Sequence, residues 1–242
     1  MTPPLSINPA LDAGALAARF AGHGRIHVPD FLAGQGAAAV HQALTGPVPW
    51  MKCVRAGGDG GDVPMADWEG MSAETRANWE RLLLAGADKD LQFQFDSWRV
   101  SDQLEAGRRA GGPLAPVEAA CDLLNSGAFL TFIHDLTGGP RGDFCDAQAT
   151  RYRPGDFLAQ HHDEVPGLNR LFAYVLNLTP IWLADWGGTL VFVGDDGHVD
   201  QGYNPAFNAL NIFRVPTRHA VTQVASYAAA HRLAITGWVR TR

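Results

Sequence analysis

The hydrophobic and polar residues of this chain follow different patterns in its two halves. Before residue 144, Ala- and Leu-rich stretches with helical spacing predict four helical regions, at 10–22, 34–45, 74–85 and 113–138. Two strands are also predicted in this half, at 24–28 and at 91–98, where apolar and polar side chains alternate. We expect this half, residues 1–143, to be a helical and β support region for a β structure formed by the other.

From residue 144 onward the pattern changes to short β segments separated by turns. The predicted strands cover 145–153, 157–163, 171–178, 188–193, 198–200, 209–214, 219–225 and 232–239. Strands of this length and spacing are typical of a jelly roll or barrel. The predicted fold is mainly β with N-terminal helices packed on one sheet. We expect one domain over 1–242, with its core at 144–242.

The segment 47–67 interrupts this pattern with several Gly and Pro residues, including the run Gly57-Gly58-Asp59-Gly60-Gly61. Glycine-rich sequence disfavours a packed state, so we expect a flexible loop. Two interpretations stay open, an idle surface loop or a mobile cover from Ala56 to Pro64 over an active-site mouth.

Composition limits the class of protein. A hydrophobic content of 46% and a charged content of 18% over 242 residues fit a soluble globular protein. The net charge of -6, with only two lysines, argues against a nucleic-acid partner. There is no apolar run of about 18 residues, so no membrane span is expected. The first residues lack the features of a signal peptide, and three scattered cysteines, Cys53, Cys121 and Cys145, indicate reduced thiols of a cytoplasmic protein. The sequence predicts no particular oligomeric state.

The stretch from Arg151 to Asp163 contains the first candidate chemistry. It reads as an Arg-Pro-Gly-Asp turn followed by a short extended run that ends in His161-His162-Asp163. In a strand, residues i and i+2 share a face, so His161 and Asp163 would direct an imidazole and a carboxylate to one point, while His162 faces away. Such a pair offers two metal ligands, although an isolated His-x-Asp is also common on solvent-facing surfaces.

A third ligand has to come from another segment. His198 follows a tight turn, and His231 ends an Ala-rich stretch where a loop is expected, whereas His219 begins a predicted strand. His219 is therefore the best candidate. Two histidines and one carboxylate on one face of a metal form the facial triad of non-haem Fe(II) oxygenases, which leaves three positions open.

The C-terminal strand strengthens this interpretation. By alternation Arg232, Ala234, Thr236 and Trp238 share one face, and the opposite face is apolar and also buried. An arginine that points into a barrel needs an anion, and Arg pairs bidentately with carboxylates. The anion is either a bound carboxylate or an acidic residue of the protein in a structural salt bridge.

Together these residues resemble the Fe(II)/2-oxoglutarate-dependent dioxygenases, specifically the prolyl 4-hydroxylase-like branch with its hypoxia-factor-type and ribosomal-protein-type prolyl hydroxylases. The matching motifs follow the family's order over about residues 144–240: Tyr152-x-x-Gly155, His161-x-Asp163, Tyr174-Val175-Leu176-Asn177, Trp186-Gly187-Gly188-Thr189-Leu190, Pro205-x-x-Asn208-x-Leu210, His219 and Arg232-x-x-x-Thr236-x-Trp238. A looser match covers Gly24 to Leu32. The interval between His219 and Arg232 is longer than is usual in the family, which predicts an extra loop at 226–231.

The resemblance implies a double-stranded β-helix, or jelly roll, and a role for each matching residue. It implies that His161, Asp163 and His219 hold Fe(II), and that Arg232 binds the distal carboxylate of 2-oxoglutarate with help from Thr236. Tyr152 hydrogen-bonds this cosubstrate or is a core tyrosine. O2 is the second cosubstrate, succinate and CO2 are released, and L-ascorbate is left open as an accessory. At Gly187-Gly188 we expect the backbone to pass closely near the substrate mouth, or a simple strand bulge.

The expected reaction is hydroxylation of a C–H bond, in a prolyl residue of a protein or peptide substrate. An apolar, weakly charged mouth with Trp182 or Trp186 would suit a proline ring, and only Arg153 and Arg170 could bind the charged groups of a free amino acid. Two alternatives stay open, a hydroxylase of a small molecule or free amino acid, and a non-catalytic metal-binding β domain that acts as sensor or scaffold. The triad together with Arg232 argues against the non-catalytic alternative.

Overall fold

The computed structural model of the chain describes residues 4–56, 59–86 and 89–242. Its helices are α1 (Ala13–His23), α2 (Gly36–Leu44), α3 (Met65–Gly70), α4 (Ala73–Ala85), α5 (Val100–Glu105), α6 (Ala115–Leu124) and α7 (Gly127–Thr137), with short 3-10 turns η1 (Gly112–Leu114) and η2 (Ala184–Trp186). The strands of the first half are β1 (Arg25–Val28), β2 (Met51–Ala56), β3 (Asp59–Pro64) and β4 (Phe93–Trp98). Those of the second half are β5 (Phe144–Cys145), β6 (Gln148–Tyr152), β7 (Phe157–His161), β8 (Arg170–Asn177), β9 (Leu190–Val193), β10 (Val199–Tyr203), β11 (Ala209–Arg214), β12 (His219–Val221) and β13 (Arg232–Arg240).

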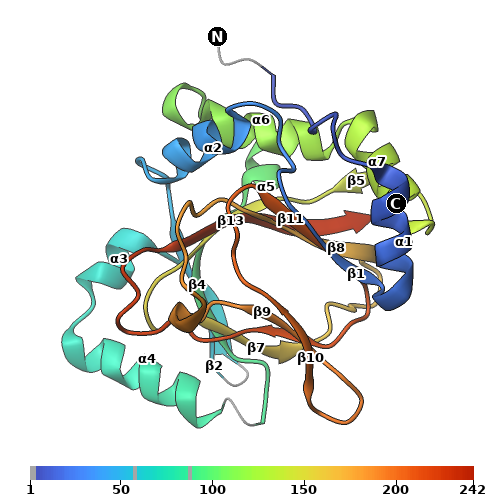
Figure 1. Cartoon of the computed structure of the whole chain (residues 1–242). Helices are drawn as coiled ribbons and strands as arrows, with labels where there is room; N and C mark the ends of the chain where they lie inside the picture. Colours follow the sequence, from blue (N-terminus) through green and yellow to red (C-terminus); the bar gives the residue numbers. More distant parts are fainter. Residues whose placement is uncertain (1–3, 57–58, 87–88) are drawn as a thin grey trace.

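The strands form an antiparallel sheet that curls almost closed into a barrel, and α1, α2, α6 and α7 cover one outer face of it (Figure 1). The strand order is β1-β11-β8-β13-β6-β4-β7-β12-β9-β10, with β2 paired to β4, β3 paired to β2 and β5 paired to β13. This is the jelly-roll arrangement, so the predicted fold class and the packing of the helices on one sheet are confirmed. Among the described residues, no helix is long and apolar enough to cross a membrane.

The helices begin and end where their sequence provides caps. The Asp12 side chain accepts a hydrogen bond from the backbone of α1, and Ser72 and Ser126 do the same for α4 and α7. Gly24 and Gly138 end α1 and α7 in the left-handed conformation. Ser126 also explains why the predicted helical region 113–138 divides into α6 and α7.

The predicted flexible loop at 47–67 is wrong for most of its length. Residues 51–56 and 59–64 form the hairpin β2–β3, and β2 also pairs with β4. A Cβ at Gly60 would lie 2.6 Å from the Val54 carbonyl oxygen, so glycine here permits close strand pairing rather than flexibility. Gly57 and Gly58 of the glycine run lie outside the described residues.

Two hydrophobic clusters lie on opposite faces of the main sheet. The larger packs between the sheet and the helices, and the smaller fills part of the barrel interior. Strand β13 contributes to both, because Leu233, Ile235 and Val239 face the helices while Ala234 faces the barrel interior. The predicted alternation of the C-terminal strand is thus confirmed. Arg232 lies on the same face as Ala234 and points into the barrel.

A buried ion network holds the turn that leads into β7. Asp96, fully buried on β4, accepts from Arg151 Nε at 2.8 Å and from Arg153 Nη2 at 3.2 Å. Lys52 Nζ lies 3.4 Å from Asp96 and 2.6 Å from Asp156. Asp156 Oδ2 in turn accepts from the Arg153 backbone N–H, which closes the Arg-Pro-Gly-Asp turn. The network therefore ties β2, β4 and β6 to the start of the strand that carries His161.

Candidate active site

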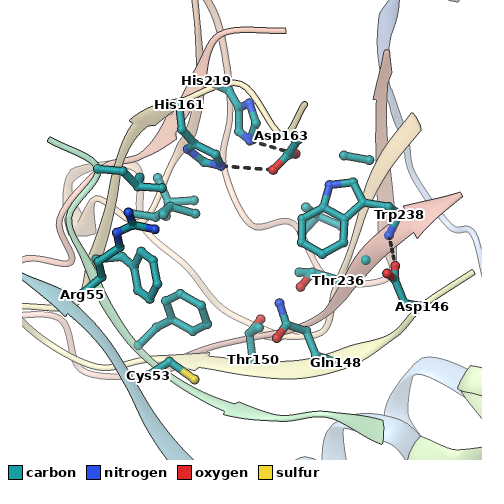
Figure 2. A pocket seen from close by; sticks show the side chains of 18 of the residues that line it. Cys53, Arg55, Asp146, Gln148, Thr150, His161, Asp163, His219, Thr236 and Trp238 are labelled. Atoms are coloured by element: carbon teal, nitrogen blue, oxygen red, sulfur yellow. Dashed lines mark hydrogen bonds and ion pairs between the residues drawn. The ribbon is translucent and has the colours of Figure 1, made fainter. Parts of the chain in front are cut away.

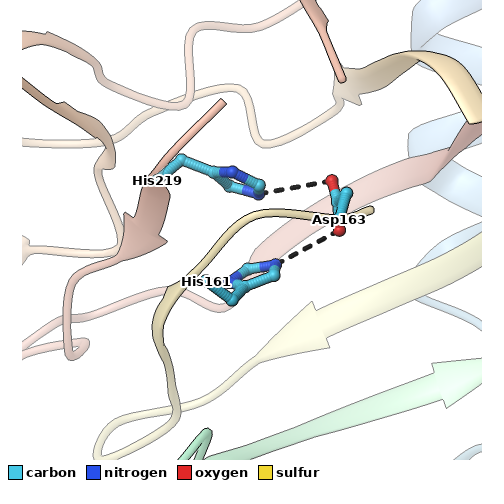
Figure 3. Close-up of side chains that lie close together, drawn as sticks. All are labelled: His161, Asp163 and His219. Atoms are coloured by element: carbon cyan, nitrogen blue, oxygen red, sulfur yellow. Dashed lines mark ion pairs between the residues drawn. The ribbon is translucent and has the colours of Figure 1, made fainter. Parts of the chain in front are cut away.

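Three side chains from separate segments meet at one point inside the barrel (Figure 3). His161 Nε2 lies 3.3 Å from one carboxylate oxygen of Asp163, and His219 Nε2 lies 3.4 Å from the other. One nitrogen or oxygen atom from each residue lies within 4.8 Å of the other two. This spacing and donor set fit a single metal ion.

The two histidines are positioned by strand pairing and by their second ring nitrogen. β7 and β12 are antiparallel neighbours, and His161 lies directly opposite His219. His161 Nδ1 lies 2.9 Å from the Ala159 carbonyl oxygen, and His219 Nδ1 lies 2.7 Å from that of Thr217. A carbonyl can only accept, so each Nδ1 carries the proton and each Nε2 presents a lone pair to the shared point.

Asp163 reaches this point from a loop and not from a strand. β7 ends at His161, so the prediction of one strand over 157–163 is wrong at its C-terminal end. The same-face rule for strands therefore does not by itself place the carboxylate. His162 is exposed, as expected, and Asp163 is buried.

The charges of the three side chains suit metal binding. Burial lowers the pKa of His219 to about 4, and the neighbouring His161 acts in the same direction against the pull of Asp163. Burial opposes ionisation of Asp163, but the facing His161, His219 and Trp238 side chains together lower its pKa below the usual value. At neutral pH the site therefore offers a neutral His219 imidazole and an ionised carboxylate, the forms that bind metals.

Arg232 is buried in the barrel without an acidic partner. Its side chain is only 2% exposed, and its Nε has no hydrogen-bond partner. Its guanidinium carbon lies 5.0 Å from the ring centroid of Tyr152. No carboxylate lies within ion-pair distance of Arg232 in the part of the chain that the structure describes. Because a buried charge needs compensation, this side chain fits a bound anion better than a structural salt bridge.

One cavity of about 930 Å³ contains all the site residues predicted from the sequence. It is lined by His161, Asp163, His219, Arg232, Thr236 and Tyr152, among others. Figure 2 shows the triad on one side of the cavity and Thr236 on the other. Tyr152 is buried and stacks on Phe95 at 5.1 Å between ring centroids, so it is a core residue that also lines the cavity.

The sequence reasoning missed two polar residues on β6. Gln148 and Thr150 line the cavity beside Thr236, with Gln148 paired to Thr236 across the strands (Figure 2). The Ser97 hydroxyl donates to Gln148 Oε1 at 2.8 Å, which fixes the amide. Alternation along the predicted strand 145–153 would have revealed both, since they share a face with Tyr152.

The expectation that Trp182 or Trp186 forms part of the cavity mouth is wrong. These two indoles pack against each other with 5.3 Å between ring centroids, and neither is among the cavity-lining residues. Trp182 Nε1 donates to the Gly187 carbonyl. Apolar side chains make up much of the cavity lining, and charged ones lie among them, including Arg55, Arg99 and Arg170. Arg170 is one of the two arginines that the sequence offered as binding groups for a free amino acid, and it does line the cavity.

The second arginine offered as a binding group for a free amino acid, Arg153, belongs instead to the ion network around Asp96. The backbone does pass closely at Gly187-Gly188, because a Cβ at Gly187 would collide with the Gln223 carbonyl oxygen and one at Gly188 would lie 3.2 Å from Arg232 Cδ. Gly188 therefore lies against the Arg232 side chain, and Gly187 lies against the Gln223 backbone. It is not among the residues that line the cavity.

Comparison with protein families and curated proteins identifies one group of relatives. Residues 147–240 match the family model of the 2OG-Fe(II) oxygenase superfamily, a range that contains the triad, Arg232 and Thr236. The chain is 35% identical over 117 residues to prolyl 3-hydroxylase OGFOD1 of Mus musculus, covering 46% of this chain and 21% of the relative. The Xenopus laevis protein of the same name is 31% identical over 117 residues, covering 46% and 22%. The match thus spans about a fifth of the length of these relatives.

Solved structures share the fold over nearly the whole chain. A prolyl-4-hydroxylase of Pseudomonas putida superposes with a TM-score of 0.57 and 20% identity, covering 96% of this chain and 100% of the other. A prolyl hydroxylase of Trichoplax adhaerens, in complex with a peptide fragment of the hypoxia inducible factor oxygen degradation domain, gives a TM-score of 0.58 and 16% identity, covering 94% and 88%. At such identities the likeness establishes the jelly-roll fold.

Proposed function

We propose that this chain, in which residues 147–240 belong to the 2OG-Fe(II) oxygenase superfamily, is an Fe(II)- and 2-oxoglutarate-dependent dioxygenase of the prolyl hydroxylase-like branch. One observation carries the proposal. A buried arginine without an acidic partner, Arg232, lines the same cavity as His161, Asp163 and His219. A metal site alone does not need such an arginine, whereas a metal site with a carboxylate cosubstrate does.

His161, Asp163 and His219 would hold Fe(II) through two imidazole nitrogens and one carboxylate oxygen, the donor set of the facial triad. When bound, Fe(II) would supply the oxidative decarboxylation of 2-oxoglutarate by O2, which gives succinate and CO2 and hydroxylates a substrate C–H bond. The protein's own contribution is to bind, orient and exclude water.

The strand floor of the cavity has the groups to bind the cosubstrate. Arg232 and Tyr152 are paired across β13 and β6, and Thr236 lies four residues further along β13 on the same face. We propose that Arg232 binds the distal carboxylate of 2-oxoglutarate and that the hydroxyls of Tyr152 and Thr236 donate to it. Apolar side chains around them, including Val175 and Phe213, would keep water from the reacting atoms.

For the substrate we propose a prolyl residue of a protein or peptide. The names of the similar proteins support this, since they are prolyl hydroxylases. The cavity of about 930 Å³ has room for the cosubstrate and an entering side chain. The exposed Arg55 in the cavity lining favours one second candidate, a hydroxylase of a small anionic molecule or free amino acid.

The remaining parts of the proposal concern the setting of the reaction. A reducing compartment such as the cytoplasm fits three buried cysteines that are free, Cys53, Cys121 and Cys145. The net charge of -6 supports a protein with no nucleic-acid partner. L-ascorbate as an accessory reductant rests on the family resemblance alone.

The test is cosubstrate turnover by the purified chain with Fe(II), 2-oxoglutarate and candidate peptides. We expect succinate to form, a metal chelator to stop it, and a productive peptide to gain one oxygen atom by mass. Failure of the wild-type chain to bind either Fe(II) or 2-oxoglutarate would overturn the proposal.

A further inference from the structure

Asp163 is held differently from the two histidines of the triad. His161 and His219 lie on paired strands, and a backbone carbonyl fixes each ring. Asp163 lies in the loop 162–169, after β7 has ended. Among the described residues, its carboxylate forms ion-pair contacts only with Nε2 of His161 and Nε2 of His219. With a metal bound, these atoms are fellow ligands and no longer support the carboxylate, so another group has to set its direction.

Two arginines hold the loop at its ends. Arg170, the first residue of β8, donates from Nη1 to the Asp163 carbonyl oxygen at 2.9 Å. Arg240 on β13 donates from Nε to the Leu168 carbonyl oxygen at 2.7 Å. The Arg170 guanidinium carbon also lies 3.6 Å from the ring centroid of Trp238, so the arginine is itself stacked in place.

Asp146 holds the backbone of Trp238 in place. Its backbone N–H donates to Asp146 Oδ1 at 2.8 Å, and the other oxygen of Asp146 lies 3.2 Å from Arg240 Nη1. Its indole Nε1 is buried and has no partner within hydrogen-bond distance among the described residues. Figure 2 shows this nitrogen turned toward the Asp163 carboxylate. A buried donor needs an acceptor, and this carboxylate is the acceptor that it faces.

We propose that Arg170 and Trp238 form a bracket that positions Asp163 as a metal ligand. Arg170 fixes the backbone of Asp163, and the Trp238 indole N–H holds the carboxylate oxygen that the metal leaves free. Groups that orient a ligand in this way tune metal affinity without touching the metal. The inference rests on the proposed function, because it requires a metal at the triad.

Activity alone would not separate this role from others, since Arg170 and Trp238 also line the cavity that receives the substrate. Metal affinity in the absence of cosubstrate and substrate makes the distinction. A residue that only contacts substrate leaves this affinity unchanged, and a residue that only stabilises the fold changes the melting temperature instead.

The first experiment titrates Mn(II) into the metal-free chain by calorimetry and compares wild type with Trp238→Phe. Phenylalanine keeps a ring for Arg170 to stack on and removes the indole N–H. We expect the affinity for Mn(II) to fall about tenfold or more. Trp182→Phe is the matched control, because it also removes an indole N–H, one that donates to the Gly187 carbonyl outside the cavity lining. This control should bind Mn(II) like wild type.

The second experiment repeats the titration with Arg170→Lys, which keeps the charge but loses the planar stack. It is matched by Arg55→Lys, another arginine of the cavity lining. We expect weaker Mn(II) binding only for Arg170→Lys, with circular dichroism confirming the fold. If Trp238→Phe does not fold, the Mn(II) affinity of Arg170→Lys alone tests whether the bracket positions Asp163.

The bracket is overturned if folded variants at Arg170 and Trp238 bind Mn(II) as tightly as a wild type that binds it well. A wild type that binds neither Mn(II) nor Fe(II) removes the metal centre itself, and with it the proposed function.

Discussion

At the scale of single residues, Arg232 is the side chain whose burial depends most on a ligand. It is 2% exposed and has no acidic partner among the described residues, and we propose that the bound cosubstrate compensates its charge. We expect Arg232→Ala to weaken binding of 2-oxoglutarate by about 2–5 kcal/mol, which is about 30-fold or more in affinity. Calorimetric titration of 2-oxoglutarate measures this, with Arg55→Ala as a charge-matched control from the same cavity lining. Equal affinity of Arg232→Ala and wild type would make Arg232 a structural residue.

Asp163 carries the second prediction at this scale. Asp163→Ala removes the only carboxylate of the triad, so we expect loss of Fe(II) binding and of 2-oxoglutarate turnover with the fold largely intact. His162→Ala changes the exposed neighbour in the same loop and should leave both unchanged. Wild-type turnover by Asp163→Ala would remove the triad assignment.

Arg232 and Thr236 could be identified from the sequence because the direction of a strand side chain depends only on its position in the local alternation. Alternation along 232–239 was enough to turn Arg232 and Thr236 inward, and the structure has them on the same face. The same rule would have found Gln148 and Thr150 on β6. It could not place Asp163, because the end of β7 depends on which strands pair beyond His161, and this is a tertiary property.

At the scale of elements, the ion network around Asp96 sets the geometry of the turn before β7. Asp96 is fully buried and compensates Arg151, Arg153 and Lys52 at once. Removal of one partner from a buried ion pair is strongly destabilising, so we expect Asp96→Ala to lower the free energy of unfolding by about 3–5 kcal/mol. Denaturant unfolding measures the change.

The control for this prediction is an ion pair on the surface. Asp122 lies 2.7 Å from Arg109, and both side chains are exposed, so Asp122→Ala should change stability little. A similarly small effect for Asp96→Ala would mean that the network does not stabilise the fold. The sequence could not reveal the network, because its members come from β2, β4, β6 and the following turn.

The hairpin β2–β3 gives a further prediction at this scale. Gly60, Gly61 and Asp62 line the cavity, and β3 is mostly exposed along its length. We still expect this edge to act as a cover, since the proposed oxygenase reaction requires that water be excluded. Amide hydrogen exchange in 59–64 should be fast in the free chain and slow when cosubstrate and peptide bind, whereas exchange in β6 should stay slow throughout. Exchange in 59–64 that is insensitive to both ligands would remove the cover.

At the scale of the whole molecule, strands of both halves enter one sheet. β1 pairs with β11, and β4 pairs with β6 and β7, so the first half supplies neighbours to the strands that carry the site. We propose on this basis that residues 1–242 act as one oxygenase domain, with 1–143 as support for 144–242. The succession of short strands in the sequence predicted the fold class correctly. The glycine content of 47–67 predicted a flexible loop wrongly, because the pairing of β2 with β4 outweighs the intrinsic flexibility of glycine.

The last prediction concerns the substrate, which depends on the cavity as a whole. We expect a peptide proline to be hydroxylated in preference to a free amino acid. In the proposed site Arg232 binds the cosubstrate, and Arg170 donates to the Asp163 carbonyl and stacks on the Trp238 ring, so we expect neither to select a small carboxylate. The fixed Gln148 amide can donate to a peptide carbonyl, which would favour a peptide backbone. The wild-type chain, with Fe(II) and 2-oxoglutarate, would face a panel of proline-containing peptides beside free proline and other free amino acids. Oxygen incorporation into a free amino acid with efficiency far above every peptide would favour the small-molecule hydroxylase instead.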